Sequence, residues 1–416
     1  MAKYTVLKFG GTSMGDEHTW KRVLDITARY ERPWVVVSAT ARTTRRLIAA
    51  AESAATDPVK ARDMAEEIDA RHRKLITGFM DEYAVDGPSS SREKEQEACL
   101  GHLDRLSEIL LGHLDAIREA GSLDDRTRDA VASIGERLSS RLLASCARAA
   151  GMQAQWVDAR ELIRTDDRFG GASPDLPFIR SAVSELLERW RGKAIPVMGG
   201  YYGQTANGNL TNLGFEGSDY TASLIGASLP CEAVEIWTDV SGVYTCDPRV
   251  VEGARPIPAL SFREATELAW FGAKVLHPST LKPASARNLT VRVKNIFEPE
   301  APGTRITGDT TSDGLVKAMA YKERSALDDG PELKRLSEEL QELGEAGLRR
   351  GVGVIGLVGC DPARQKELVE RLRRALGDIK LETLSYSSTK RNLNLVVEAG
   401  HTVEAVRRLH EELFEG

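Results

Sequence analysis

Short apolar runs alternate with longer amphipathic stretches through roughly the first three-quarters of the chain. The runs are rich in β-branched and aromatic residues, and most of the stretches between them show helical periodicity. Strands separated by helices pair in parallel, because a parallel connection requires a long crossover. The pattern therefore predicts an α/β fold, an open and mostly parallel sheet sandwiched by helices, which binds ligands beyond the carboxyl ends of its strands. The predicted strands are residues 4–9, 34–38, 155–157, 195–198, 234–238 and 290–294, and the first predicted helix is 16–30.

Long charged amphipathic segments interrupt this alternation between about residues 58 and 150. They break at Gly87-Pro88 and at Gly121-Ser122, dipeptides that are typical of turns. The region is predicted to be a helical insertion that covers one face of the sheet.

A different pattern begins after residues 303–314, a stretch rich in Gly, Thr, Asp and Ser that is typical of a linker. Shorter strands and helices follow it and predict an α+β domain. We therefore expect one domain of residues 1–307 and another of residues 308–416. The second contains predicted strands at 315–321, 352–358, 379–386 and 393–398 and predicted helices at 331–349, 362–376 and 402–414.

The composition excludes several classes of function. The 416 residues carry 56 basic and 62 acidic side chains without a dense basic stripe, so nucleic acid is not an expected partner. No apolar run approaches the roughly 18 residues of a membrane span, and the N-terminus lacks a signal-peptide pattern, so we expect no membrane partner and a cytoplasmic location. The five cysteines lack CxxC spacing and are expected to be reduced thiols.

The segment VLKFGGTSMG at residues 6–15 has the composition of an anion-binding site. Lys8 contributes a positive charge, and the hydroxyl of Ser13 can donate a hydrogen bond. Gly10 and Gly11 allow backbone N–H groups to approach a ligand closely. The alternative is a strand that ends in a tight turn, with Lys8 in solvent.

Two further glycine-rich stretches favour phosphate binding. Residues 199–203 follow a predicted strand, and residues 212–221 lead into a helical pattern that Ser218 or Asp219 could cap. The chain has no GxxxxGK[ST] and no convincing GxGxxG motif, which disfavours a P-loop ATPase and a dinucleotide-binding dehydrogenase. Cations and aimed N–H donors are what the transfer of a phosphoryl group requires.

Residues 237–249 and 272–278 add an acidic loop, an aromatic side chain and two cations. Arg249 and Lys274 are candidate phosphate-binding cations, and Tyr244 is a candidate to pack against a nucleotide base. The alternative for each stretch, taken alone, is a surface loop with polar side chains that binds no nucleotide.

Seven short motifs occur along the chain in the order KFGGTS, VVVSAT, SIGERLSS, RTDDRFG, LGFEGSDYTA, WTDVSGVYTCDPR and FGAKVLHP. In this order and spacing they resemble the motifs of the aspartate kinases of the amino-acid kinase superfamily. The resemblance covers residues 1 to about 307, and the later domain resembles the ACT module that these enzymes carry. It implies transfer of the γ-phosphoryl group of ATP to the β-carboxylate of aspartate, the first step of aspartate-family amino-acid biosynthesis, including that of lysine.

The resemblance also implies roles by position. It makes Lys8 and Asp219 catalytic, with Lys8 on the transferred phosphoryl group, and it makes Glu136 the acceptor of the substrate's α-ammonium group. It implies ATP and Mg²⁺ as cofactors, with no protein residue assigned as a metal ligand. The implied ATP-binding residues are Lys8, Gly10, Gly11, Ser13, Thr238, Asp239, Tyr244, Asp247, Arg249 and Lys274. The implied substrate-binding residues are Ser38, Thr44, Glu136, Tyr201, Phe215, Glu216 and Ser218.

One departure from the family pattern concerns the substrate. The pattern Gly-Arg-Gly-Gly-Ser-Asp is replaced by Gly-Phe-Glu-Gly-Ser-Asp at residues 214–219, so Phe215 stands where an arginine would bind a substrate carboxylate. Such a loss costs on the order of 1.5–3 kcal/mol unless it is replaced. One interpretation is that nearby arginines restore the charge and the substrate is aspartate. The other is that Glu216 marks a kinase for a different amino or carboxylic acid, or a weakly active regulatory relative. The arginines concerned are Arg42, Arg45 and Arg46.

A second departure concerns regulation. Aspartate kinases usually carry two ACT modules, the first spliced into the second, whereas only residues 322–351 separate the predicted strand 315–321 from the elements at 352–416. The inserted module is therefore expected to be reduced to the helix at 331–349. We expect weak feedback control by lysine or threonine, and a homodimer formed through the single ACT-like domain.

Overall fold

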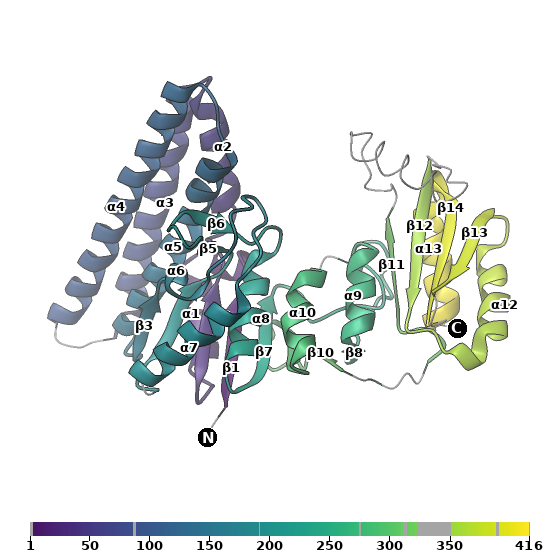
Figure 1. Ribbon diagram of the computed structural model, residues 1–416. Helices are drawn as coiled ribbons and strands as arrows, with labels where there is room; N and C mark the ends of the chain where they lie inside the picture. Colours follow the sequence, from purple (N-terminus) through teal and green to yellow (C-terminus); the bar gives the residue numbers. More distant parts are fainter. Residues whose placement is uncertain are drawn as a thin grey trace. The chain divides into compact units, whose positions relative to one another are not determined.

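The computed structural model describes residues 3–85, 89–190, 192–273, 276–308, 310, 314–322, 351–387 and 391–415. The chain divides into two compact units, one formed by Met1–Ser241 and Ser279–Arg305 and the other by Gly242–Pro278 and Ile306–Gly416 (Figure 1). Each unit has its own apolar core. None of the described helices is long and apolar enough to cross a membrane.

The first unit confirms the predicted parallel sheet. Its strands lie in the order β3 (Ala154–Val157), β4 (Ile195–Gly199), β2 (Pro33–Val37), β1 (Tyr4–Phe9), β7 (Cys231–Thr238) and β9 (Thr290–Asn295). All five pairings between these neighbours are parallel. β1 is buried along its whole length, as expected for a central strand of a parallel sheet covered on both faces. From β1 the chain passes to β2 on one side and later returns to β7 on the other, so the order reverses at β1, where such sheets bind ligands.

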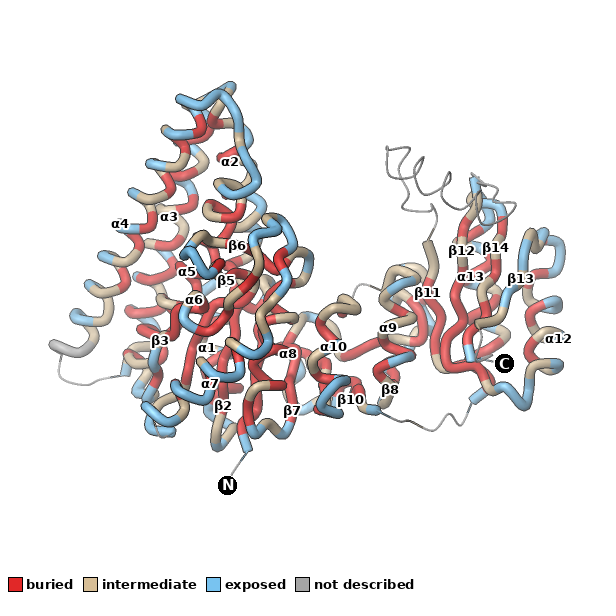
Figure 2. Tube along the Cα trace, in the orientation of Figure 1, coloured by how far each residue is buried: buried red, intermediate tan, exposed pale blue. Residues whose placement is uncertain are grey.

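Helices cover this sheet and bring the polar loops together at its carboxyl end. α5 (Asp125–Ala149) packs on β3 and β4, and α8 (Gly217–Ser228) packs on β1, β2 and β7. α7 (Leu176–Trp190) packs against α8. Figure 2 shows the strands of this sheet as buried and the outer sides of the helices as exposed.

The helical insertion is confirmed. α2 (Thr43–Ala54) packs on α3 (Pro58–Tyr83), α3 on α4 (Ser89–Ala120), and α4 on α5, through a continuous apolar core that includes Phe79, Leu110 and Leu142. The predicted break at Gly121-Ser122 is also confirmed, because Gly121 adopts a left-handed backbone with φ of 69° and Asp124 then caps α5.

The second unit contains an antiparallel sheet in the order β11 (Ala318–Lys322), β12 (Val352–Val358), β14 (Asn392–Glu398) and β13 (Leu381–Tyr386). Its core joins this sheet to α12 (Gln365–Leu376) and α13 (Thr402–His410). α9 (Phe262–Trp270) packs on β11 and β12 of the same unit, and Gly356 of β12 lies so close to Phe271 that an added Cβ would meet the ring at 2.4 Å.

Element ends differ from the predictions at several places. The strand predicted at 315–321 begins at Ala318 instead, because Ala318 is the first residue paired with β12. The helix predicted at 402–414 ends at His410 and continues as a π turn, Glu411–Glu415. The helix predicted at 331–349 lies outside the described residues. The remaining elements are η1 (Thr12–Met14), α1 (Glu17–Thr27), α6 (Ala159–Leu162), β5 (Tyr202–Gln204), β6 (Leu210–Asn212), β8 (Ala259–Ser261), α10 (Pro278–Ala286), β10 (Thr304–Thr307), η2 (Pro362–Arg364) and η3 (Ala399–His401).

Candidate active site

The turn after β1 lies at the point where the strand order reverses. Gly10 N–H donates to the carbonyl oxygen of Trp237 at 3.2 Å, which ties the turn to the neighbouring strand β7. The buried hydroxyl of Ser13 donates to the same oxygen at 3.4 Å. A Cβ built on Gly10 or Gly11 would meet only atoms at 3.5 Å or more. A side chain at these positions would therefore make ordinary van der Waals contacts, so packing within the protein does not require glycine there; Gly11 lines the cavity described below.

The two predicted catalytic residues form a buried ion pair. Lys8 Nζ, from β1, contacts Asp219 Oδ1, from the first turn of α8, and the side chains are 10% and 7% exposed. The pair fixes the lysine ammonium at the carboxyl end of the sheet. It excludes the alternative in which Lys8 points into solvent.

The prediction that Ser218 or Asp219 caps α8 is wrong. The cap residue is Glu216, with φ of 54° and no hydrogen bond from its side chain to the helix end, so the helix already begins at Gly217. Close packing imposes this early start. A Cβ on Gly200, after β4, would lie 2.6 Å from the Cα of Ser218, so the first turn of α8 presses against the backbone after β4.

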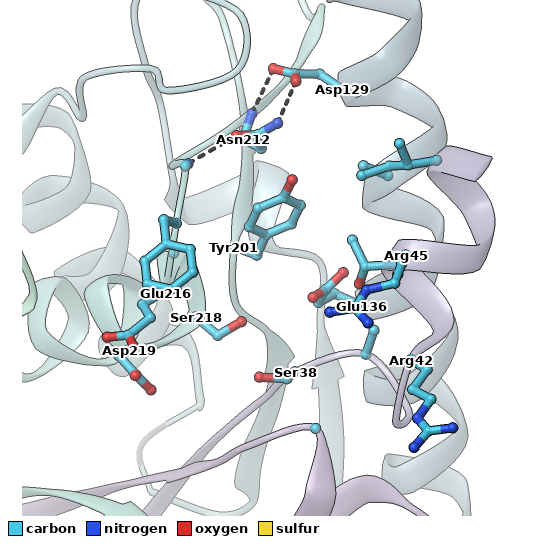
Figure 3. A pocket seen from close by; sticks show the side chains of 18 of the residues that line it. Ser38, Arg42, Arg45, Asp129, Glu136, Tyr201, Asn212, Glu216, Ser218 and Asp219 are labelled. Atoms are coloured by element: carbon cyan, nitrogen blue, oxygen red, sulfur yellow. Dashed lines mark hydrogen bonds between the residues drawn. The ribbon is translucent and has the colours of Figure 1, made fainter. Parts of the chain in front are cut away.

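One cavity of about 740 Å³ gathers most of the predicted site. It includes Arg42 and Arg45 of the three arginines considered above, whereas Arg46 is not among its lining residues and pairs with Glu67 at 3.2 Å. Figure 3 shows side chains from the loop after β2, from α5 and from the start of α8 around this space. The predicted residues that line it are Lys8, Gly11, Ser38, Thr44, Glu136, Tyr201, Phe215, Glu216, Ser218 and Asp219.

Backbone strain is concentrated at the same cavity. Of the four non-glycine residues with left-handed φ in the described part of the chain, three line it: Arg42 at 67°, Tyr201 at 71° and Glu216 at 54°. Such conformations are costly for residues with a Cβ and occur mostly where a site requires them. The strain therefore marks the cavity as functional independently of side-chain chemistry.

Glu136 is a buried carboxyl group in the cavity, and its pKa is far from the ordinary value. It lies on α5, is buried, and its Oε2 has no hydrogen-bond partner among the described residues. Burial raises the pKa of Glu136 to about 8, although the N–H of Ala39 and the charge of Lys8 act in the opposite direction. Gly135 allows this placement, since a Cβ there would lie 2.8 Å from the Cβ of Ala39. A buried carboxylate without a partner is suited to receive a cationic group of a ligand.

The loop after β2 is held by α3. Thr40 Oγ1 donates to Nε2 of His72 at 3.0 Å, while Nδ1–H of His72 donates to the carbonyl oxygen of Ile68 at 2.7 Å. Burial lowers the pKa of His72 to about 4, so the imidazole is neutral and able to accept at Nε2. Arg71 donates to the carbonyl oxygen of Ala41 at 2.5 Å.

The loop before α8 is held by Asp129. This buried carboxylate, on α5, accepts from the N–H of Gly170 at 3.0 Å and from the N–H and side-chain amide of Asn212. Asn212 Oδ1 in turn accepts from the N–H of Gly214 at 2.9 Å. Burial raises the pKa of Asp129. Sequence reasoning missed Asp129, His72 and Arg71, because nothing in a single sequence marks polar residues within a helical insertion as supports of distant loops.

The predicted nucleotide residues after β7 belong partly to the other unit. Thr238 ends β7 and Asp239 follows it in the first unit, where the threonine hydroxyl donates to the aspartate at 3.2 Å. Tyr244, Asp247 and Arg249 lie in the second unit, and Arg249 makes a two-point contact with Asp247 at 3.0 and 2.6 Å. Lys274 lies outside the described residues. Among the residues that the structure describes, no group of three or more His, Cys, Asp or Glu is placed to hold a metal ion.

Comparison with known proteins identifies the family. The model of the amino acid kinase family matches residues 3–295. Lysine-sensitive aspartokinase 3 of Escherichia coli is 30% identical, with all of both chains covered. Aspartokinase 1 of Arabidopsis thaliana is 30% identical over 99% of this chain and 80% of the relative. The crystal structure of E. coli aspartokinase III in complex with aspartate and ADP superposes with a TM-score of 0.82 at 28% identity, covering 99% of this chain and 100% of that one.

The fold is thus that of a phosphotransferase. The chain belongs to the amino acid kinase family and, within it, to the aspartokinases.

Proposed function

We propose that the protein transfers the γ-phosphoryl group of ATP to the β-carboxylate of L-aspartate and releases 4-phospho-L-aspartate. The transfer is direct and in line, without a phosphorylated enzyme intermediate. The observation that carries the proposal is the cavity at the end of β1, which is lined both by the Lys8–Asp219 ion pair and by the unpaired Glu136. The E. coli relative whose crystal structure contains aspartate and ADP supports aspartate as acceptor and ATP as donor.

In the proposed reaction each residue has a role that its chemistry explains. Lys8 neutralises charge on the transferred phosphoryl oxygens, and Asp219 holds the lysine in place. The N–H groups of Gly10 and Gly11, with Ser13, form the phosphate cradle. Glu136 takes the α-ammonium group of aspartate. The remaining proposed substrate contacts are Ser38, Thr44, Tyr201, Phe215, Glu216 and Ser218.

ATP is proposed to bind with its terminal phosphate at this cradle. Thr238, Asp239, Tyr244, Asp247, Arg249 and Lys274 are the proposed nucleotide contacts. Mg²⁺ is proposed to enter as the MgATP complex, in which phosphate oxygens supply most of its ligands and few protein ligands are needed. The cytoplasm supplies both substrates, so a cytoplasmic location is part of the proposal.

The experiment that tests the proposal traps the acyl phosphate with hydroxylamine. Wild-type protein with MgATP is expected to form the hydroxamate of aspartate. Lys8→Ala should lower turnover by about 10²–10³-fold, the usual cost of removing one group that stabilises transition-state charge. Lys21→Ala is the matched control, because Lys21 pairs with Asp25 on the surface of α1. Equal rates for Lys8→Ala and the control would contradict the proposal.

A kinase for another amino or carboxylic acid is the second candidate function. It is favoured by Phe215, which lines the cavity, is 78% exposed and offers no charge to a substrate carboxylate. A trapping screen across amino and carboxylic acids, on the wild type and on Phe215→Arg/Glu216→Gly, separates the two. A better acceptor than aspartate for the wild type favours the second function. ATP binding without turnover of any acid favours a regulatory relative.

Regulation is proposed to be weak. We propose that residues 1–307 form the catalytic domain and that residues 308–416 form a single ACT-like domain, with the usual second module reduced to a helix at 331–349. The E. coli relative is named as lysine-sensitive, and its alignment spans 468 positions against the 416 residues of this chain, which is consistent with a segment missing here. Inhibition of the wild type by micromolar lysine or threonine would refute weak control.

A homodimer through the ACT-like domain is also proposed, and it is a separate point from the weak feedback control.

A further inference from the structure

The basic side chains of the cavity differ in whether they already have a partner. Four line it. Lys8 pairs with Asp219, and Arg128 pairs with Glu52 at 2.8 Å. For Arg42 and Arg45 the described part of the chain supplies no ion pair or hydrogen bond to the guanidinium. The cavity therefore contains two cations whose charge is uncompensated.

Arg45 and Glu136 both line the cavity and come from helices that pack against each other. Arg45 belongs to the first turn of α2, and α2 packs along α5, the helix that carries Glu136. In Figure 3 the guanidinium of Arg45 is directed toward Glu136, whereas that of Arg42 is turned away from it. The two charged groups nevertheless form no ion pair within 4.0 Å.

Arg45 and Glu136 share the cavity without forming an ion pair with each other. A ligand that carries both a negative and a positive group could therefore pair with both side chains. In an α-amino acid the ammonium and the α-carboxylate are attached to the same carbon atom, so their receptors must lie on one side of the site. Glu136 and Arg45 meet that condition. At the start of α8 the cavity is lined by Phe215 and Glu216, neither of which is a cation, and the described cation there, Lys8, is paired with Asp219.

We propose that the guanidinium of Arg45 binds the α-carboxylate of the amino-acid substrate. Arg45 then selects substrates that carry a carboxylate next to the ammonium group bound by Glu136. This inference rests on the proposed function, because it assigns a specificity contact within the same cavity. The loop that leads into α2 is already fixed by His72 and Arg71, so binding orders few additional groups.

The test compares aspartate with 3-aminopropanoate, which keeps the ammonium group and the carboxylate to be phosphorylated but lacks the α-carboxylate. For Arg45→Gln we expect kcat/KM for aspartate to fall about 10- to 100-fold, mainly through KM, as for loss of a charge-assisted contact. The rate with 3-aminopropanoate should stay as in the wild type, so the preference for aspartate disappears. Arg45→Lys, which keeps the charge without the planar fork, should retain part of the preference.

Arg46→Gln is the matched control, because Arg46 is the next residue of α2 and pairs with Glu67 instead of lining the cavity. It should keep the wild-type preference. Calorimetric titration with aspartate provides a readout that is independent of turnover. If the wild type binds aspartate without phosphorylating it, the proposed function fails, and the loss of affinity in Arg45→Gln still decides the role of Arg45. If Arg45→Gln keeps both the affinity and the preference of the wild type, or if the wild type does not bind aspartate, the inference is overturned.

Discussion

The proposed role of Glu136 as acceptor of the substrate's ammonium group predicts that aspartate binding depends on pH. The pKa of Glu136 is raised from the ordinary 4.5 to about 8 by burial, so the group is largely protonated in the empty site at neutral pH. An ammonium group binds to the ionised form. Each aspartate bound near pH 7 should therefore release nearly one proton, and affinity should rise with pH until the group is ionised in the free protein.

The size of the effect follows from the fraction of molecules that are ready to bind. With a pKa of about 8, that fraction is about 0.01 at pH 6, about 0.1 at pH 7 and about 0.5 at pH 8. KM for aspartate should thus fall about 50-fold between pH 6 and pH 8, whereas KM for ATP should change little. The same shift affects stability, since a raised carboxylate pKa removes stability as pH rises from 4.5 toward 8. At pH 7 this amounts to about 3 kcal/mol.

Two measurements check this reasoning. Calorimetric titration of aspartate in buffers with different ionisation enthalpies counts the protons released, and thermal unfolding at pH 5 and pH 8 reports stability. Glu136→Gln keeps the shape without the charge, so it should bind aspartate weakly, release no proton, and gain thermal stability relative to the wild type at pH 8 but not at pH 5. A proton count near zero for the wild type at pH 7, or a KM for aspartate that is constant from pH 6 to pH 8, would refute the assignment of Glu136.

Three further changes test other parts of the site. Lys8→Ala leaves Asp219 buried without its partner, so its unfolding free energy should fall on the order of 3–5 kcal/mol; adding Asp219→Asn should recover much of the thermal stability but none of the turnover. Asp129→Ala strands the N–H groups of Gly170 and Asn212, so it should lower stability by about 1–3 kcal/mol and raise KM for aspartate more than KM for ATP. In the second unit, His410→Phe removes the partner of the Thr245 hydroxyl at 2.9 Å; steady-state kinetics should show a higher KM for ATP with an unchanged KM for aspartate, and the reverse pattern would argue against nucleotide contacts from residues 244–249.

The sheet was predictable because each strand is marked by a short run of apolar residues in its own segment of the sequence. β1, β2 and β7 are short runs that are mostly apolar, as a central parallel strand requires, and glycines follow β1 and β4. The meeting of Lys8 and Asp219 followed from a rule of topology, since parallel strands bring the segments at their carboxyl ends together. Glu136 lies within α5, and only the resemblance pointed to it. The resemblance of short motifs then supplied the roles that charge alone left open.

The start of α8 was not predictable in the same way. Ser218 and Asp219 have the residue types of a helix cap, and local preference therefore favoured a helix beginning after them. The contact between Gly200 and Ser218 joins segments that are not neighbours along the chain, and it places the helix start at Gly217, with Glu216 in a strained conformation. A tertiary contact thus overrode a local preference at the point where the site needs the Asp219 carboxylate against Lys8.

The pairing of charges in the cavity also lies beyond sequence patterns, and it decides what the cavity can bind. The sequence alone does not distinguish Arg42, Arg45 and Arg46. In Figure 3 the guanidinium of Arg45 is directed toward Glu136 and that of Arg42 is not. Arg46 forms an ion pair with Glu67 and does not line the cavity. The Lys8–Asp219 ion pair holds the lysine ammonium at the cavity, where it is proposed to neutralise charge on the transferred phosphoryl oxygens. The protonated Glu136 and the solvated Arg45 leave the empty site stable, because no buried charge remains without compensation. A zwitterionic amino acid converts both groups into ion pairs at once, whereas a dicarboxylic acid without an ammonium group leaves Glu136 protonated and gains only the contact to the arginine. In the proposed assignment, selectivity for an amino acid therefore arises from the difference between the empty and occupied charge states of Glu136 and Arg45.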